Sequence, residues 1–302
     1  MTRVKTVCDP KKASRPHPIR PRKYWDYLLV DLDGTLLDSR GTVSPRTREA
    51  LIRAVAGGMQ LVVATGRTYR SLLRVTEGLD LPPFHMITNG GAVGLSPRGA
   101  EVRYTNFLAP ELWPRVVETL HGEGLSTLVF SHRHPEPPLY YVSRGEGDPH
   151  FEAYLGRNPQ YMRVRPRLGQ ASISNVVEVA ALGRENGFDA ASTRVLRRLA
   201  GITRNHSMVL YIDGAYGKVT EFFEPGTSKW RAFQALFPEA AAHPERVIAI
   251  GDEANDVEMI GSAGLGIAMG NAVPAVKAVA DRITGDHDQE GVADALEGVL
   301  RG

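Results

Sequence analysis

The stretch VDLDGTLLD, residues 30–38, closes an apolar run with two carboxylates, Asp31 and Asp33, and continues at once into Gly34 and a threonine. An Asp-Gly pair is ordinary turn chemistry, so these nine residues are compatible with a solvated turn and with a reaction centre. The run before them, YLLV at 27–30, is typical of a buried strand. The rest of the chain has to decide between the two interpretations.

The chain around this stretch alternates between strand-like and helix-like segments. A helix is expected after Ser44, a favoured N-cap residue, with Pro45 at its first position and Gly57 near its end. A second apolar strand, QLVVAT at 60–65, follows that helix. This alternation predicts βαβ units and a buried parallel sheet.

The pattern changes in the middle of the chain and later returns. Alternating strand-like segments, with helices expected near 109–121 and 188–200, fill residues 90–222, and short apolar strands such as RVIAIGDE then resume. We therefore predict a doubly wound, Rossmann-like α/β core with a parallel sheet and an inserted α+β domain. The predicted core is residues 24–89 and 223–302, and the predicted insertion is residues 90–222.

Composition indicates a globular, cytoplasmic protein. The 302 residues are 42% hydrophobic, contain one cysteine, and include no apolar run of the roughly 18 residues that a membrane-spanning helix needs. Residues 1–23 hold eight Lys or Arg against one Asp, are rich in proline, and lack the apolar segment of a secretory signal. We expect this basic tail to be disordered.

Polar side chains follow four strands of the predicted core. They are Asp31 and Asp33 after YLLV, Thr65, Gly66 and Arg67 after LVVA, Asn89 after HMI, and Asp252, Asn255 and Asp256 after VIAI. Each group alone is ordinary turn or helix-cap chemistry. Because the carboxyl ends of parallel strands meet at one edge of a sheet, these carboxylates would repel one another unless a cation gathers them. Mg²⁺, which prefers oxygen ligands, suits Asp31 and Asp252.

Lys229 is expected at the start of the helix that follows Pro225. Amide groups at a helix N-terminus favour anions, and a lysine there would help a metal ion to balance the charge of a phosphate monoester. On its own, however, a lone lysine is most simply a solvated surface side chain.

Four segments together resemble the haloacid dehalogenase superfamily of aspartate-based phosphatases. They occur in the family's order: DLDGT at 31–35, ATGR at 64–67, Lys229, and GDEANDVEM at 251–259. Asn89-Gly90-Gly91 and the stretch at 270–296 are further similar to the Cof-like branch, which carries a large type IIB α+β cap between its second and third motifs. The resemblance covers nearly all of the chain after Tyr24.

The resemblance implies a role for each matching residue. Asp31 would be the nucleophile that forms an aspartyl-phosphate, and Asp33 would be the acid and base whose backbone carbonyl also binds Mg²⁺. Thr65 and Lys229 would hold the phosphoryl oxygens, and Asp252 would complete the metal site.

The resemblance also implies supporting roles around these groups. Asn255 and Asp256 would orient the metal-bound waters and Lys229. Gly34 would allow the sharp turn beside the phosphate, near which we also place Gly66, Arg67 and Asn89.

Two residues stand apart from this pattern. Trp230 follows the motif lysine where the family often has glycine, which predicts changed packing or a substrate contact beside Lys229. Asp38 matches no motif, so we interpret it as ordinary surface charge.

The sequence thus predicts a Mg²⁺-dependent phosphatase for a small phosphorylated metabolite such as a sugar phosphate, with neither a nucleic-acid nor a membrane partner. One alternative is a phosphomutase or phosphotransferase similar to phosphomannomutases, which pass the phosphoryl group to a sugar hydroxyl. Another is a non-catalytic domain that binds a phosphorylated ligand.

Overall fold

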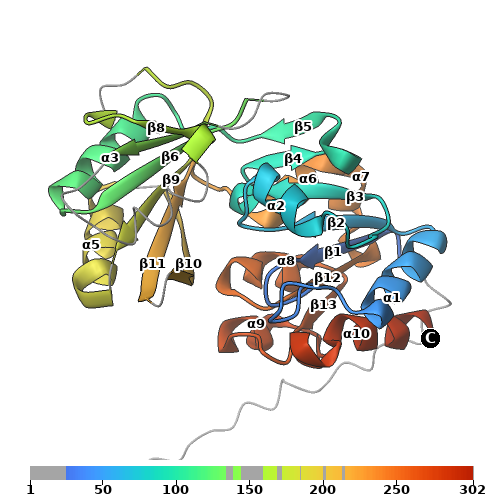
Figure 1. Ribbon diagram of the computed structural model, residues 1–302. Helices are drawn as coiled ribbons and strands as arrows, with labels where there is room; N and C mark the ends of the chain where they lie inside the picture. The colour runs from blue at the N-terminus through green and yellow to red at the C-terminus, as the bar shows by residue number, and fades with distance from the viewer. Residues whose placement is uncertain are drawn as a thin grey trace, which may run out of the picture.

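The chain forms two β-sheets, each accompanied by its own helices (Figure 1). The structure is a computed structural model that describes residues 25–133, 139–143, 159–168, 172–183, 185–199, 202–212 and 215–301. The predicted basic tail lies outside the described residues. Within the described part of the chain, no helix has the length and apolar character needed to cross a membrane.

The larger sheet has eight strands and carries both halves of the predicted core. Its strands, in spatial order, are β14 (Arg282–Ile283), β13 (Leu265–Ala268), β12 (Val247–Gly251), β1 (Tyr27–Asp31), β2 (Gln60–Ala64), β3 (Phe84–Thr88), β4 (Val93–Leu95) and β5 (Val102–Thr105). The first six run parallel, and β4 and β5 are antiparallel. Every residue of β1 and of β12 is buried, as expected for central parallel strands. The predicted α/β class is confirmed.

Helices flank this sheet, and several of them pack on one another. They are α1 (Pro45–Ala56), α2 (Tyr69–Thr76), α6 (Lys229–Leu236), α7 (Pro238–Ala242), α8 (Val257–Ser262), α9 (Pro274–Val279) and α10 (Gly291–Leu300). The Ser44 hydroxyl accepts the N–H of Thr47 at 3.1 Å, and Pro45 is the first residue of α1, as the sequence predicted. The helix α1 ends at Ala56, has Gly57 as its C-cap residue, and packs against α10.

The smaller sheet has six strands with helices on one face. In spatial order the strands are β10 (Thr203–Ile212), β11 (Ala215–Phe223), β9 (Val176–Gly183), β6 (Ser126–Ser131), β7 (Leu139–Ser143) and β8 (Met162–Val164). The helices α3 (Leu112–Gly122) and α5 (Glu185–Arg198) pack on this sheet and on each other (Figure 1). Side chains such as Leu128, Phe130 and Ala180 instead join the hydrophobic core of the larger sheet. The smaller sheet therefore touches the larger one directly.

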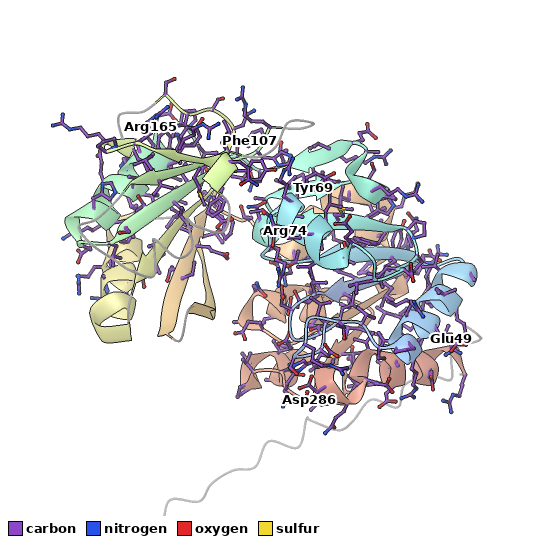
Figure 2. The ribbon with its side chains drawn as sticks, viewed as in Figure 1. Glu49, Tyr69, Arg74, Phe107, Arg165 and Asp286 are labelled. Atoms are coloured by element: carbon purple, nitrogen blue, oxygen red, sulfur yellow. The ribbon has the colours of Figure 1, made fainter. Side chains whose placement is uncertain are left out.

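Sheet membership differs from the predicted boundary after residue 89. The strands β4 and β5, at 93–105, pair with β3 in the larger sheet. The reason is the turn Asn89–Gly91, in which Asn89 and both glycines have positive φ and return the chain antiparallel to β3. We propose that the inserted domain begins after Thr105, near Phe107, which is labelled at the crossing in Figure 2.

The two chain crossings between the sheets are tied together by side chains. Asn106 Nδ2 donates to Thr227 Oγ1 at 2.9 Å, and the N–H of Ala109 donates to Glu224 Oε2 at 2.9 Å. The outgoing and returning segments are thus hydrogen-bonded to each other at the junction.

Candidate active site

A lysine and two aspartates form the buried centre of the site. Asp31 is the last residue of β1, and Lys229 is the first residue of α6. The Lys229 Nζ lies 2.5 Å from Asp31 Oδ1 and 2.6 Å from Asp256 Oδ1. Only 1% of Lys229 is exposed, so the interpretation as a solvated surface lysine is wrong.

Close backbone packing fixes the start of α6. The Ser228 hydroxyl caps the helix by accepting the N–H of Arg231 at 3.1 Å. A Cβ on Gly91, whose φ is +110°, would lie 2.2 Å from the Ser228 carbonyl oxygen, so only glycine allows this approach. Trp230 is buried and stacks on Phe233 with ring centroids 5.3 Å apart. The indole therefore packs in the hydrophobic core beside Lys229.

Asp252 and Asp256, after β12, have different surroundings. Asp256 Oδ2 accepts the N–H groups of Asp252 and Glu253, both at 3.0 Å, while its Oδ1 accepts from Lys229. Both oxygens of the Asp256 carboxylate thus already accept hydrogen bonds, from the loop after β12 and from Lys229. Asp252 Oδ1 accepts from Thr35 Oγ1 at 2.8 Å, and Asp252 Oδ2 is the group nearest to Gly34.

The turn after β1 packs directly on Asp252. Gly34 has φ +75°, and a Cβ there would lie 2.4 Å from Asp252 Oδ2. Asn271 Nδ2 donates to the Gly34 carbonyl at 2.8 Å and to Asp252 Oδ2 at 3.2 Å. Sequence reasoning missed Thr35 and Asn271. The available signals were the place of Thr35 inside DLDGT and of Asn271 in a loop that follows a predicted strand.

Asp33 is held by an arginine fork. Arg67 Nε lies 2.8 Å from Asp33 Oδ2, and Arg67 Nη2 lies 2.7 Å from Asp33 Oδ1. Thr65 Oγ1 accepts the N–H of Arg67 at 3.1 Å. Both members of the ion pair are partly exposed, so a ligand can reach them. The structure thus places Arg67 on Asp33, an arrangement that the sequence did not predict.

Three further predicted residues lie around this centre. Asn89 is buried and donates from Nδ2 to Glu178 Oε2, in the smaller sheet, at 2.8 Å. A Cβ on Gly66 would lie 3.8 Å from Glu221 Oε1, also in the smaller sheet. Asn255 has a buried Oδ1 without a hydrogen-bond partner. Asn89 and Gly66 therefore face the inserted region.

The charged side chains at the centre of the site have a net negative charge, which a bound cation would balance. Four carboxylates, on Asp31, Asp33, Asp252 and Asp256, face the cations Lys229 and Arg67, which leaves a formal charge of −2. Burial raises the pKa of Asp252 to about 6, and burial together with the neighbouring carboxylates raises the pKa of Asp31 well above its ordinary value. Burial alone would lower the pKa of Lys229, but Asp256 and Asp31 raise it.

The donor set at this centre fits a hard divalent ion. One ligand atom from each of Asp31, Asp252 and Asp256 lies within 4.8 Å of the others, and all are carboxylate oxygens. Such oxygens are the ligands that Mg²⁺ prefers, and its charge would balance the deficit. Because Asp256 is occupied by Lys229 and two N–H groups, Asp31 and Asp252 are the better-placed ligands.

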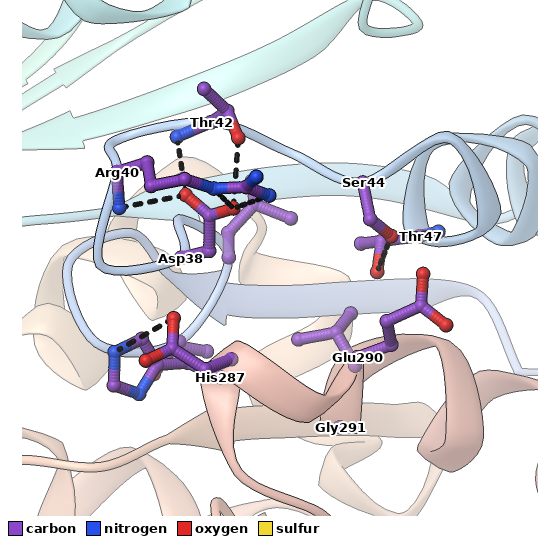
Figure 3. Close-up of a pocket in the computed structure, with 12 residues that line it drawn as sticks. Asp38, Arg40, Thr42, Ser44, Thr47, His287, Glu290 and Gly291 are labelled. Carbon is purple, nitrogen blue, oxygen red and sulfur yellow. Dashed lines mark hydrogen bonds and ion pairs between the residues drawn. The ribbon is translucent and has the colours of Figure 1, made fainter.

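Asp38 is a loop organiser, and its interpretation as ordinary surface charge is wrong. It accepts hydrogen bonds from the backbone N–H groups of Arg40 and Thr42 and from both of their side chains (Figure 3). These bonds, led by the Thr42 N–H, lower the pKa of Asp38. The loop borders a pocket of about 240 Å³ that Thr35 and His287 also line.

Comparison with known proteins agrees with this geometry. Residues 28–296 match the haloacid dehalogenase-like hydrolases. The chain belongs to this family. The haloacid dehalogenase-like match confirms the predicted superfamily and the predicted class of enzyme, a hydrolase whose relatives include phosphatases.

Curated relatives of this haloacid dehalogenase-like chain are similar over most of its length. It is 27% identical over 282 residues to the 5-amino-6-(5-phospho-D-ribitylamino)uracil phosphatase YitU of Bacillus subtilis, covering 90% of this chain and 96% of YitU. It is 25% identical to the pyridoxal phosphate phosphatase YbhA of Escherichia coli, covering 89% and 96%. It also matches the chloroplastic endoribonuclease YBEY of Arabidopsis thaliana at 27% identity, but spans only 46% of that protein.

Solved structures show the same fold. A haloacid dehalogenase-like hydrolase from Bacteroides thetaiotaomicron superposes with a TM-score of 0.72 at 29% identity, covering 92% of this chain and 100% of the other. The subclass IIB sugar phosphatase BT4131 superposes with a TM-score of 0.69 at 21% identity, covering 91% and 99%. At that identity the second likeness concerns the fold alone.

Proposed function

We propose that this protein hydrolyses small phosphomonoesters by passing the phosphoryl group through Asp31. The observation that carries the proposal is the buried Asp31 at the end of β1, with the Lys229 ammonium 2.5 Å away and Asp33 two residues further on. An internal cation of this kind would offset the charge of an incoming phosphate, which is what phosphoryl transfer requires of a protein.

In the first step, a carboxylate oxygen of Asp31 attacks phosphorus and the bond from phosphorus to the alcohol oxygen breaks. Asp33 gives a proton to that oxygen, so the alcohol leaves uncharged. Thr65, a buried residue whose Oγ1 accepts the N–H of Arg67, would donate its hydroxyl to a phosphoryl oxygen.

In the second step, water hydrolyses the aspartyl-phosphate. Asp33 takes a proton from the water, the new oxygen–phosphorus bond forms, and the bond from phosphorus to the Asp31 oxygen breaks, which releases inorganic phosphate. Both Asp33 oxygens accept from Arg67, so the fork has to release one of them for each proton transfer, and the partial exposure of the pair would allow a ligand to displace it.

Asp31 and Asp252 would hold Mg²⁺, with the Asp33 backbone carbonyl as the third protein ligand that the family resemblance implies. When bound, Mg²⁺ supplies positive charge to the phosphoryl oxygens. Thr35 and Asn271 fix the carboxylate of Asp252, which orients it toward this position.

The test is release of inorganic phosphate from phosphomonoesters, measured with Mg²⁺ and with EDTA, by wild-type protein and Asp31→Asn. We expect release that needs Mg²⁺, and a loss on the order of 10⁴-fold in Asp31→Asn because the amide is a poor nucleophile. A phosphomutase or phosphotransferase would instead yield a phosphorylated product with little free phosphate.

Asp80→Asn is the matched control, since Asp80 is an exposed aspartate that forms an ion pair with Arg48 at the surface. That variant should keep wild-type turnover. Full turnover by Asp31→Asn would overturn the proposal.

A further inference from the structure

Ser71, on the first turn of α2, contacts the arginine that holds Asp33. Arg67 Nη1 donates to Ser71 Oγ at 3.1 Å, while Nε and Nη2 of the same guanidinium donate to the Asp33 carboxylate. All three nitrogens of the guanidinium therefore have a hydrogen-bond partner. Ser71 lies outside the segments that carry the family resemblance, so sequence analysis did not select it.

The backbone of Arg67 is held independently of this contact. Its N–H donates to Thr65 Oγ1 at 3.1 Å, and its carbonyl accepts the N–H of Asn89 at 2.9 Å. These bonds fix the backbone but leave the side chain free to rotate about its own bonds, and arginine has more of this freedom than most residues. The hydrogen bonds to Ser71 and Asp33 restrict that rotation.

The helix α2 keeps Ser71 in place. The Thr68 side chain caps the helix by accepting the N–H of Ser71 at 3.4 Å, and the next residue, Leu72, is entirely buried. In the ion pair of Arg67 with Asp33, by contrast, 31% of each side chain is exposed. Water screens a pair that is exposed to this extent, so charge alone fixes its geometry weakly. The Ser71 hydroxyl therefore adds a restraint on the guanidinium that the ion pair lacks.

The proposed reaction requires Asp33 to leave the arginine fork and to return to it. In the first step Asp33 gives its proton to the alcohol oxygen as the bond from phosphorus to that oxygen breaks, and Asp33 becomes a carboxylate. In the second step this carboxylate takes a proton from the attacking water. A guanidinium held by Ser71 stays in one place while Asp33 moves, so it receives the carboxylate in the same position in every cycle.

We infer that Ser71 is a positioning residue for proton transfer by Asp33, and that it acts through Arg67. This inference rests on the proposed phosphatase function and adds to it a residue outside the motifs. Loss of the Ser71 hydroxyl should impair the hydrolysis of esters whose leaving group needs a proton. It should leave nearly unchanged the hydrolysis of esters whose leaving group does not.

Two kinds of phosphomonoester separate these cases. An alkyl phosphate releases a strongly basic alkoxide, which needs the proton of a general acid, whereas p-nitrophenyl phosphate releases a phenolate that is stable without one. The alkyl probe is whichever of glycerol 3-phosphate and glucose 6-phosphate the wild-type protein hydrolyses faster with Mg²⁺. The constant to compare is kcat/KM, because it reports the reaction up to the departure of the leaving group.

In Ser71→Ala we expect kcat/KM to fall about tenfold for the alkyl phosphate and less than about twofold for p-nitrophenyl phosphate. Ser71→Thr, which keeps the hydroxyl, should restore most of the activity on the alkyl phosphate. Thr76→Ala is the control, because Thr76 lies on the same helix and its hydroxyl donates to the Leu72 carbonyl at 2.9 Å. It should leave both constants at the wild-type value.

The double variant Asp33→Asn/Ser71→Ala tests whether Ser71 acts through Asp33. Asp33→Asn alone should lower kcat/KM for the alkyl phosphate by about 100-fold or more. Adding Ser71→Ala should then lower it less than about twofold further. Alanine favours helix formation, so we expect Ser71→Ala to fold. If thermal unfolding shows otherwise, Ser71→Cys repeats the test, since a thiol is only a weak hydrogen-bond acceptor.

Each outcome has a distinct meaning. Wild-type protein that releases phosphate from none of the probes would refute the proposed function. Release from p-nitrophenyl phosphate alone would refute proton donation by Asp33 and, with it, this inference. The role of Ser71 would be refuted, and the phosphatase function left standing, by three results: an equal loss for both probes in Ser71→Ala, no loss for either, or a further tenfold loss when Ser71→Ala is added to Asp33→Asn.

Discussion

Lys229 supplies positive charge to the buried carboxylates of the site. Its ammonium is the cation that touches both Asp31 and Asp256. In Lys229→Met, two buried carboxylates would lose their cation, and we expect the free energy of unfolding to fall by about 3–5 kcal/mol. Urea unfolding at neutral pH measures this. The variant Lys229→Met/Asp256→Asn, which removes one of the stranded charges, should recover part of the loss, and a double variant less stable than Lys229→Met would contradict the explanation.

Single residues were predictable where a strand end and a motif coincided. Asp31 and Asp252 were selected in that way, Lys229 was selected as a motif residue at a predicted helix start, and the structure brings the three together. The role of Thr35 was not predicted, because its hydroxyl donates a hydrogen bond to Asp252, which is distant in sequence. Asp38 was misjudged because its bonds depend on a loop that returns at Thr42, and no pattern of apolar residues records such a return.

Among the elements, α1 and α10 are joined by an ion-pair network that makes stability depend on pH. Hydrogen bonds from Arg46, first among several causes, lower the pKa of Glu297 from an ordinary value near 4.5 to about 2. A lowered pKa stabilises the fold above about pH 4.5, and this contribution is lost as the pH falls through 2. Glu297→Gln should therefore lower the melting temperature at pH 7 by about 1–3 °C.

The difference between Glu297→Gln and the wild-type protein should shrink as the pH is lowered from 4.5 toward 2 in calorimetric scans. Glu49→Gln is the control, since Glu49 is an exposed residue of α1 whose ion pair with Arg53 spans 3.5 Å. It should change the melting temperature much less. A difference that stays constant across this pH range would count against the network.

The elements themselves were predictable to different degrees. Cap residues fixed both ends of α1, because Ser44, Pro45 and Gly57 act locally. The segment 93–105 was predicted to lie in the inserted domain, but its strands β4 and β5 belong to the larger sheet, since an alternating segment suits the edge of either sheet. Their partner is decided by the positive-φ turn after β3, which sequence periodicity does not reveal.

At the scale of the whole molecule, the junction between the sheets depends on Glu224. Its carboxylate accepts the N–H of Ala109 at 2.9 Å and so ties the returning segment to the outgoing one. In Glu224→Ala we expect the Ala109 amide to exchange hydrogen about fivefold faster, because a net hydrogen bond of about 1 kcal/mol is lost. Exchange measured by mass spectrometry on a peptide spanning residues 106–112 reports this.

Glu111→Ala provides the comparison for that experiment, because Glu111 is exposed and makes no side-chain cap for α3. It should leave the exchange of the Ala109 amide unchanged. Equal exchange in Glu224→Ala and the wild-type protein would show that the junction is held by other contacts.

The overall plan, a parallel core interrupted by an inserted α+β region, followed from the order of strand and helix patterns. The approach of the smaller sheet to the site did not follow, because the contacts of Glu178 with Asn89 and of Glu221 with Gly66 join strands of different sheets. The spacing of residues along the chain does not reveal which side chains of the two sheets come into contact.

The position of β1 between β2 and β12 also has a consequence for synthesis on the ribosome. Asp31 emerges about 220 residues before Asp252, which at typical elongation rates is a delay of roughly 10–40 s. During that time one edge of β1, an entirely buried strand in the finished protein, has no partner strand. The nascent chain therefore exposes one edge of β1 until β12, at 247–251, has been made.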